Sequence, residues 1–389
     1  MNLLKKIFSW SIVLVGILWI TLYLTNTDYL LKAVRTIYLK GHTTAYLEDY
    51  KHFDNQPLKR GTPQAWSQHR DYNKVAPTKK LLQTHKTLGS VAYVIIKNDS
   101  IWHEAYYDGF GETSKTNSFS MAKSYVTAML GKAIMEGYIQ GLEQPVCDFI
   151  PEICDKKNAN AQKMTVGDLA SMASGTNWDE RYYSPLSITT RAYFDDNLTR
   201  VITGLKVVDE PGKAFKYASG DTQMLAIAIE RATGKKLYTY LTESFWIPLG
   251  CENESLWQLD SKENDLVKAY CCIASNAKDF ARLGKLYKDH GKWNGEQLLD
   301  STFIATSVTP RFASSPQYGY GWWLKRMGDK SFFMMRGHLG QYVIVEPNDN
   351  VIIVRLGHSK GEGDAIATFT PDITTYIEEA YTMLESQKH

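Results

Sequence analysis

The nonapeptide Asn117-Ser118-Phe119-Ser120-Met121-Ala122-Lys123-Ser124-Tyr125 places a lysine three residues after a serine. At the opening of a helix, this spacing puts the Ser120 hydroxyl and the Lys123 amine on neighbouring positions of one face. A serine hydroxyl is a poor nucleophile at neutral pH, and a neighbouring amine whose pKa is lowered by burial can activate it. The stretch therefore predicts a nucleophile beside its base.

The sequence around Ser120 has the order expected of an enzyme site. Two β-rich runs, 91–97 and 101–107, flank the turn-forming triplet Asn98-Asp99-Ser100 and predict a hairpin. A glycine-containing loop comes next, and a helical stretch to about Glu136 follows Ser120. Strand, loop, nucleophile and helix thus follow one another, which favours a functional serine at this position.

A second Ser-x-x-Lys match, Ser275-Asn276-Ala277-Lys278, lacks that setting. It opens a polar-to-amphipathic helix over 276–289, in which Ser275 is expected to be the N-cap. Lys278 and Lys285 are expected to lie on the solvated face of this helix. We therefore prefer Ser120 as the nucleophile.

The charge balance of the 389-residue chain argues against a polyanionic partner. Lys and Arg total 44 and Asp and Glu total 42, a formal charge of only +2, so nucleic-acid binding is not expected. No Cys-x-x-Cys or His-x-x-x-His spacing occurs, so a dedicated metal site is not expected either. The 24 Tyr and 10 Trp suit membrane interfaces and the walls of substrate clefts.

The first residues predict a membrane-crossing segment. Lys5 and Lys6 precede an apolar run from Ile7 to Leu24, just long enough to cross a bilayer as a helix with its positive end in the cytoplasm. A cleaved signal peptide is the alternative, but residues 23–28 offer no Ala-x-Ala cleavage site and no cysteine for lipid attachment. We expect residues 1–25 to be an uncleaved transmembrane anchor, with the catalytic domain extracytoplasmic and periplasmic if the organism is Gram-negative.

The remainder divides into a linker and one domain. Residues 26–84 are polar, with turn-forming residues and little apolar periodicity, and predict a stalk or linker. The domain is expected over 85–389, with strands at its two ends and helices between. This order predicts an α/β fold of the α+β type: an antiparallel sheet from about 85–120 and 270–389, flanked by helices, with an all-helical insertion over about 121–269. A cleft between the two parts is the natural active site.

Capping and turn signals mark individual elements within the domain. Thr165 and Asp168 have the spacing of a capping box at a helix start. The other expected elements are a buried helix over 221–232 ending at Gly234, strands over 332–335, 341–346 and 351–356, a turn at 348–350, and a closing helix over 371–384.

The five cysteines leave two interpretations open. If the domain is exported, its cysteines can be oxidised, and Cys147 and Cys154 are close enough in sequence to pair across a loop. Cys251, Cys271 and Cys272 would then leave an odd member. Alternatively, all five are small buried hydrophobic residues.

Two further boxes follow Ser120: Tyr217-Ala218-Ser219-Gly220, and His338-Leu339-Gly340 inside 336–342. With these boxes the chain resembles the serine hydrolases related to class C β-lactamases, penicillin-binding proteins and 6-aminohexanoate-dimer hydrolases. That family carries Ser-x-x-Lys, then Tyr-x-Ser or Tyr-x-Asn, then Lys-Thr-Gly or His-x-Gly on a strand. The likeness covers about residues 85–385 and implies a β-lactamase/transpeptidase-like fold, although Tyr182-Tyr183-Ser184 rivals the second box.

The resemblance implies a role for each box. Ser120 would be the nucleophile that becomes acylated, Lys123 would take part in its deprotonation, and Tyr217 would shuttle protons to the leaving group. Ser219 would extend the hydrogen-bond network, and the backbone amides of Ser120 and Gln341 would form the oxyanion hole. Without the resemblance, Tyr217 reads as a core tyrosine at a helix entrance.

The third box departs from Lys-Thr-Gly, because His338 and Leu339 replace the lysine and the threonine. Lysine would supply a fixed cation for a substrate carboxylate, whereas histidine is mostly neutral at pH 7 and leucine offers no hydroxyl. The resemblance therefore implies esters or linear amides rather than β-lactams. The substrate-binding residues that it implies are His338, Gly340, Ser219, Tyr182, Trp322 and Trp323. Taken alone, the histidine and the three aromatic residues could serve only in packing.

Three hypotheses follow. The first is a membrane-anchored, cofactor-free serine hydrolase that cleaves a small ester or linear amide through an acyl-enzyme on Ser120. The second is a β-lactamase or D-alanyl carboxypeptidase acting on cell-wall-like substrates. The third is a catalytically silent peptide- or lipid-binding protein on the same fold, against which intact Ser120, Lys123 and Tyr217 argue. The sequence leaves the acyl group, the leaving group and the oligomeric state open.

Overall fold

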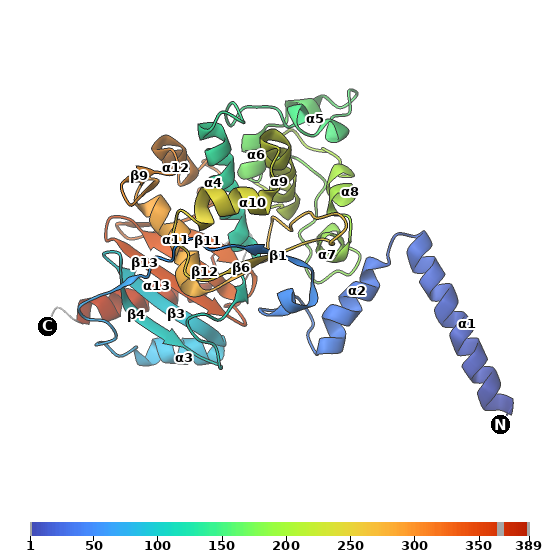
Figure 1. Cartoon of the computed structure of the whole chain (residues 1–389), viewed down its shortest axis with the longest axis horizontal. Coiled ribbons are helices and arrows are strands. Elements are labelled where there is room, and N and C mark those ends of the chain that lie inside the picture. The colour runs from blue at the N-terminus through green and yellow to red at the C-terminus, as the bar shows by residue number, and fades with distance from the viewer. Residues whose placement is uncertain (1, 364–368, 387–389) are drawn as a thin grey trace.

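The computed structural model describes residues 2–363 and 369–386. Residues 1, 364–368 and 387–389, which belong to the predicted anchor and domain, lie outside the described residues. Figure 1 shows a long helix, α1 (Asn2–Leu24), that projects away from a body built of a sheet with its helices and a cluster of further helices.

The main sheet has seven strands and assembles both ends of the domain. Its order is β10-β11-β12-β13-β3-β4-β2, antiparallel throughout except where the short β2 pairs in parallel with β4. The strands are β10 (Trp323–Met327), β11 (Lys330–Gly337), β12 (Gln341–Glu346), β13 (Val351–Gly357), β3 (Ser90–Lys97), β4 (Ser100–Tyr106) and β2 (Ser67–Gln68). The predicted hairpins are confirmed as β3–β4 and β12–β13, and the first turns through Asn98 and Asp99 at φ of 51° and 59°.

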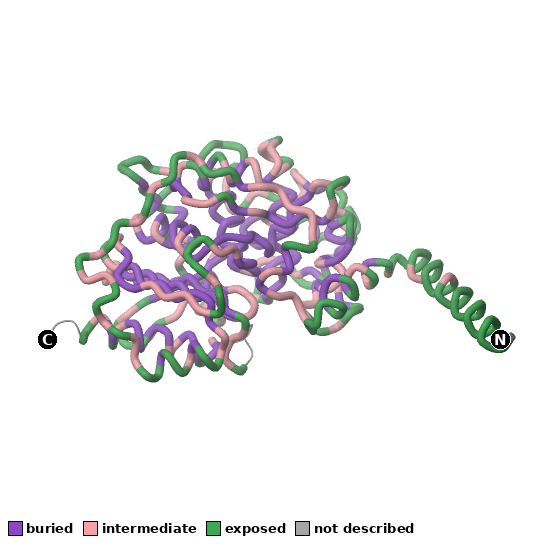
Figure 2. Tube along the Cα trace, turned by 60° about the horizontal axis from the view of Figure 1, so that its bottom comes forward, coloured by how far each residue is buried: buried purple, intermediate pink, exposed green. Residues whose placement is uncertain are grey.

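Helices cover both faces of this sheet. On one face, α11 (Ala277–Lys288) packs on β12 and β13; on the other, α13 (Pro371–Ser386) packs with α3 (Lys79–Thr87). Successive strand residues alternate between the two cores: Val94 and Ile96 join one hydrophobic cluster, whereas Tyr93 and Ile95 join the other. The strands are therefore buried on both sides, as Figure 2 shows by their purple trace.

The remaining helices form the second part of the domain. Its core pair is α4 (Ala122–Met135) and α9 (Ser219–Thr233), surrounded by α5 (Ala159–Lys163), α6 (Val166–Ala170), α7 (Ile188–Phe194), α8 (Leu198–Thr203), α10 (Leu237–Leu241) and α12 (Ser301–Ser307). The capping box of Thr165 and Asp168 is confirmed at the start of α6, and α9 ends at Gly234 in the left-handed conformation, φ 68°. The predicted fold class is confirmed, with a mixed sheet in place of a purely antiparallel one.

The segment expected to be a stalk, 26–84, is instead built into the domain. Strand β1 (Asn55–Leu58) pairs with β6 (Ser255–Gln258), and Leu58 and Leu81 are fully buried. Helix α2 (Tyr29–Thr36) packs against α7. The segment shows no sustained periodicity in sequence because its elements are short and pack against partners that lie far away in sequence.

A smaller sheet, of order β1-β6-β7-β5, corrects the expectation for the second Ser-x-x-Lys match. Ser275 lies in β7 (Ile273–Ser275), and Asn276, not Ser275, caps α11 by accepting a hydrogen bond from Asp279 N. The Lys278 side chain is only 13% exposed and pairs with Glu112 at 2.7 Å. The match is thus a strand end and a helix cap.

Of the two interpretations of the cysteines, pairing holds for four. Cys147 bonds to Cys154 and Cys271 bonds to Cys272, while Cys251 is buried without a disulfide partner among the described residues. The apolar part of α1, Leu3–Leu24, has a mean hydropathy of 2.1 and no buried share, so its length and composition suffice to cross a membrane.

Candidate active site

Ser120 lies in the one-turn helix η3 (Phe119–Met121), between β5 (Thr116–Asn117) and α4. Phe119, directly before it, has φ of +46°, a left-handed conformation that costs energy for a residue with a side chain and is typical of functional turns. Asn117 Oδ1 accepts from Phe119 N at 2.9 Å, and Ser118 N donates to Ile273 O at 2.7 Å. The turn is thereby held to β7, and one side-chain and one main-chain hydrogen bond fix the backbone next to Ser120.

Strand β11 approaches this turn closely. A Cβ atom on Gly337 would lie 2.2 Å from Ser118 O, so only glycine fits at this crossing. Gly337 is paired with Gln341 at the start of β12. The structure therefore brings the first box against the strand pair that carries the third box.

Lys123 contacts Ser120 directly. Its Nζ lies 2.9 Å from Ser120 Oγ and donates to Tyr270 O, also at 2.9 Å. Burial lowers the pKa of Lys123 to about 8, against an opposing effect from the carboxylates of Glu180 and Asp221. About a tenth of the amine is therefore neutral at pH 7 and about half at pH 8, and this neutral form can take a proton from Ser120.

Tyr217 stands directly before α9, buried beside the same amine. Its ring centroid lies 5.1 Å from Lys123 Nζ and 5.4 Å from the ring of Trp323. Burial raises the pKa of Tyr217 and the charge of Glu180 raises it further, whereas a hydrogen bond with Ser120 lowers it. The phenol is thus held in its protonated form next to the serine.

Glu180 is a central residue of the site that the sequence patterns missed. Its two carboxylate oxygens accept four hydrogen bonds: from Ser219 Oγ at 2.5 Å, Ser219 N at 2.8 Å, Tyr182 OH at 2.6 Å and Trp178 Nε1 at 2.6 Å. It therefore fixes the start of α9 and the orientation of Tyr182 together. Glu180 lies in an irregular loop at no fixed spacing from any box, so the sequence carries no signal for it.

His338 lies across the cleft from α9, in η7 (His338–Gly340) between β11 and β12. It stacks on Tyr182 with ring centroids 5.4 Å apart and meets the edge of Phe119 at 5.4 Å. Burial lowers the pKa of His338 to about 4, and nearby Lys360 adds to this. The imidazole is thus neutral at pH 7, and the part of the chain that the structure describes offers its buried Nε2 no hydrogen-bond partner.

Gly340 and Gln341 complete the turn of the third box. Gly340 has φ of +82°, and a Cβ there would lie 2.3 Å from Arg355 Nη1. The Gln341 side chain donates to Gly357 O at 2.7 Å and accepts from Gly357 N at 3.1 Å. These contacts lock the backbone at the position expected to supply an oxyanion donor, while the glutamine side chain faces β13.

Of the two tryptophans predicted to bind substrate, only Trp323 lies in the cleft. Trp323 lines the cleft together with Ser120 and Tyr217, and its ring lies 4.3 Å from the Arg336 guanidinium. Trp322 is fully buried and packs on Tyr287 with ring centroids 4.4 Å apart. Adjacent residues at the start of a strand face opposite sides of the sheet, so Trp322 lies in the core and outside the cleft.

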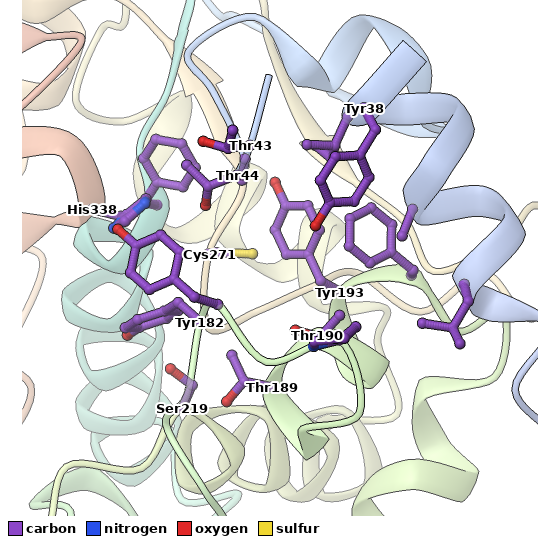
Figure 3. Close-up of a pocket in the computed structure, with 18 of the residues that line it drawn as sticks. Tyr38, Thr43, Thr44, Tyr182, Thr189, Thr190, Tyr193, Ser219, Cys271 and His338 are labelled. Atoms are coloured by element: carbon purple, nitrogen blue, oxygen red, sulfur yellow. The ribbon is translucent and has the colours of Figure 1, made fainter. Parts of the chain in front are cut away.

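Two adjoining cavities meet at Ser120. The larger, of about 410 Å³, extends toward α2, and the smaller, of about 190 Å³, extends toward Trp323, Arg336 and Lys360. Figure 3 shows the larger one, with Tyr182 and His338 side by side at one end and Ser219 below them. The structure therefore brings Ser120, Lys123, Tyr217, Ser219, Tyr182, His338 and Trp323 together around one cleft.

Comparison with known proteins agrees with this geometry. The family model described as Beta-lactamase matches residues 78–371. A 6-aminohexanoate-dimer hydrolase of Paenarthrobacter ureafaciens is 24% identical over 290 residues, which is 68% of this chain and 71% of that protein. Among solved structures, a Bacillus anthracis protein assigned as a 6-aminohexanoate-dimer hydrolase has a TM-score of 0.71 at 19% identity, covering 88% of this chain and 94% of its own. A family VIII carboxylesterase has a TM-score of 0.59 at 15% identity, covering 79% of this chain and 98% of its own. The chain belongs to the β-lactamase family, as a serine hydrolase with esterase and amidase relatives.

Proposed function

We propose that this protein cleaves a small ester or linear amide through an acyl-enzyme on Ser120, in a domain anchored outside the cytoplasm by α1. The observation that carries the proposal is the contact of Lys123 Nζ with Ser120 Oγ at 2.9 Å, combined with a lysine pKa lowered to about 8. A neutral amine at hydrogen-bond distance is the base that a serine nucleophile requires.

In this proposal, acylation uses the groups that surround Ser120. Ser120 Oγ forms a bond to the substrate carbonyl carbon while its proton passes to Lys123, and the backbone amides of Ser120 and Gln341 stabilise the oxyanion. Tyr217 donates its phenolic proton to the leaving oxygen or nitrogen as the scissile bond breaks, and it regains a proton from Lys123. Water attacks the acyl-enzyme by the reverse use of the same groups and releases the carboxylic acid.

The neutral His338 supports esters and linear amides over β-lactams. Its pKa of about 4 leaves no fixed positive charge at the position where the family can carry lysine. The relatives described as a 6-aminohexanoate-dimer hydrolase and a carboxylesterase support the same direction. The β-lactamase or carboxypeptidase alternative draws support from Arg336 and Lys360, which line the smaller cavity and could attract a carboxylate.

An extracytoplasmic position is supported by two features. Helix α1 carries Lys5 and Lys6 in its N-terminal part, which would be the cytoplasmic end, and it has the length and apolarity of a membrane span. The disulfide between Cys147 and Cys154 fits an oxidising compartment. Together they support a single-span anchor with the active site on the far side of the membrane.

Two measurements test the proposal. A compact fluorophosphonate should label the native full-length protein and should not label the Ser120→Ala protein, and absence of labelling of the native protein would refute an active serine. Turnover of nitrophenyl esters should exceed turnover of nitrocefin in kcat/KM. Faster nitrocefin hydrolysis would replace the esterase or amidase proposal with the β-lactamase alternative.

A further inference from the structure

The larger cavity connects the nucleophile to the N-terminal segment. Near Ser120 it is lined by Phe119, Tyr182 and His338, and its far wall is formed by α2 with the residues that follow it. Figure 3 shows Tyr38 and α2 on the side of the cavity opposite His338 and Tyr182, with Thr43 and Thr44 along the upper edge. A segment that precedes the family match at residue 78 therefore shapes the substrate cleft.

The inner surface of this cavity is apolar. None of the described residues that line it is an Asp, Glu, Lys or Arg, and burial keeps His338 neutral. Two of its hydroxyl groups are engaged by protein acceptors, since Thr190 Oγ1 donates to Ser184 O at 2.8 Å and Tyr193 OH donates to Asp49 at 2.6 Å. The buried Tyr270 OH has no hydrogen-bond partner among the described residues. The lining therefore offers a ligand mainly carbon surface, supplied by residues such as Leu30, Ala33, Ile37, Ala45, Pro185 and Phe194.

Exposed apolar side chains surround the mouth of the cavity. Val34, Tyr38 and Tyr183 line it and are at the same time 44%, 56% and 75% exposed. Large apolar residues gathered at the rim of a cavity are typical of a site that meets an apolar ligand or a membrane. The helix that lines the mouth also follows α1 closely in sequence, because α2 begins at Tyr29, five residues after α1 ends at Leu24. In Figure 1, α2 stands between α1 and the body of the domain.

We infer that this cavity holds the hydrocarbon acyl chain of an amphiphilic ester or amide, with the substrate carbonyl at Ser120. The inference rests on the proposed hydrolase function and specifies its acyl group. The acyl chain enters past Val34, Tyr38 and Tyr183 and lies along α2, while the polar leaving group lies toward Arg336 and Lys360 in the smaller cavity. Each methylene group of the acyl chain that is buried in the cavity then adds to the preference for long-chain substrates.

The test is a chain-length series measured on the full chain in vesicles of ether-linked phosphatidylcholine, which a hydrolase cannot cleave. The substrates are nitrophenyl acetate, butanoate, hexanoate and octanoate. We expect kcat/KM to increase about fourfold for each added methylene, because each buried methylene adds a nearly constant increment of binding free energy. A flat series, in a protein whose Ser120 still reacts with a compact fluorophosphonate, would overturn the inference and leave the proposed hydrolase function intact.

Two variants fill the cavity from different sides. Ala33→Phe acts from α2, where Ala33 is 6% exposed, and Ala45→Phe acts from the following loop. Each should reduce the octanoate-to-acetate ratio of kcat/KM at least tenfold. The matched control is Leu31→Phe, on the same helix but 41% exposed and outside the cavity lining, and its ratio should stay native. Equal ratios in all three variants would contradict an acyl chain in this cavity.

A binding measurement keeps the inference testable if no ester is turned over. Fluorescence of dansyl-undecanoate should report binding to the Ser120→Ala protein, with protein-free vesicles as the blank, and Ala33→Phe or Ala45→Phe in that background should weaken it. Absence of binding would overturn the inference.

The substrate could come from the bilayer or from the aqueous phase, and vesicles of ester-linked phosphatidylglycerol separate these two sources. Ser120-dependent release of fatty acid identifies a bilayer lipid. A chain-length preference without such release identifies a water-borne amphiphile.

Discussion

Replacing Lys123 by methionine should separate the chemistry of the site from the cost of holding a buried amine. Lys123 is 2% exposed, and burial lowers its pKa from 10.5 to about 8. A shift of this size corresponds to about 3 kcal/mol of unfavourable free energy at pH 7, where the amine must be protonated in a site that disfavours charge. The hydrogen bonds to Ser120 and Tyr270 offset part of this cost, so about 3 kcal/mol is an upper bound for the gain in stability.

The pH dependence of stability has a definite sign. The pKa of Lys123 is lower in the folded state, so between pH 8 and 10.5 the unfolded chain binds more protons and the free energy of unfolding rises with pH. Lys123→Met should remove this rise and should be at least as stable as the native protein at pH 7. Thermal unfolding of the full chain in detergent micelles at pH 7 and pH 10, followed by tryptophan fluorescence, measures both effects.

Lys123→Met should reduce catalysis, although it should not reduce stability. The base is the neutral amine, so kcat/KM for a nitrophenyl ester should rise with pH through about 8 and then level off. Lys123→Met should lose this rise and about 10²- to 10⁴-fold of kcat/KM, the usual contribution of a positioned base. Lys132→Met, on the same helix but partly exposed and paired with Glu136, is the matched control. A Lys123→Met protein destabilised by several kcal/mol, or a native profile without a limb near pH 8, would refute the assignment of Lys123 as a buried base.

Three further variants probe other contacts. Glu180→Gln removes a charge that raises the pKa of Lys123, so the rising limb of the kcat/KM profile should move to lower pH, and an unmoved limb would argue against this coupling. Gly337→Ala places a Cβ 2.2 Å from Ser118 O and should cost about 10²-fold in kcat/KM by displacing the nucleophile, while native activity would show that the crossing is looser than described. Leu81→Ala, at a fully buried position, should lower the free energy of unfolding by about 2–5 kcal/mol. Leu82→Ala, at the neighbouring position that is 46% exposed, should change it by about 0.5 kcal/mol or less. Equal effects would refute the integration of residues 26–84 into the domain.

The features that the sequence predicted well depend on local signals. The spacing of Ser120 and Lys123 matters because a helix turn brings the two side chains together without help from the rest of the fold. The capping box at Thr165 and the helix stop at Gly234 are likewise complete within a few residues. Such signals also identified the hairpins, whereas the fold class was predicted from the order of strands and helices and from the resemblance to β-lactamase-related serine hydrolases.

The features that the sequence did not predict depend on partners far away. The apolar residues around Leu58 gain a strand partner only from Ser255–Gln258, so the segment 26–84 reads as a polar linker until the fold is known. Glu180 owes its place in the site to Ser219, which is 39 residues away in sequence and meets it only in three dimensions. Periodicity cannot decide which of two adjacent tryptophans faces the cleft, because the answer depends on strand register.

Mass spectrometry of a trapped acyl-enzyme tests the nucleophile most directly. The full-length protein is mixed with a nitrophenyl ester, quenched in acid within the first turnovers and digested. The acyl mass should appear on the peptide that contains Ser120, and it should be absent from the Ser120→Ala protein and from the peptide that contains Ser275. An adduct on another residue, or turnover by the Ser120→Ala protein at the native rate, would contradict an acyl-enzyme on Ser120.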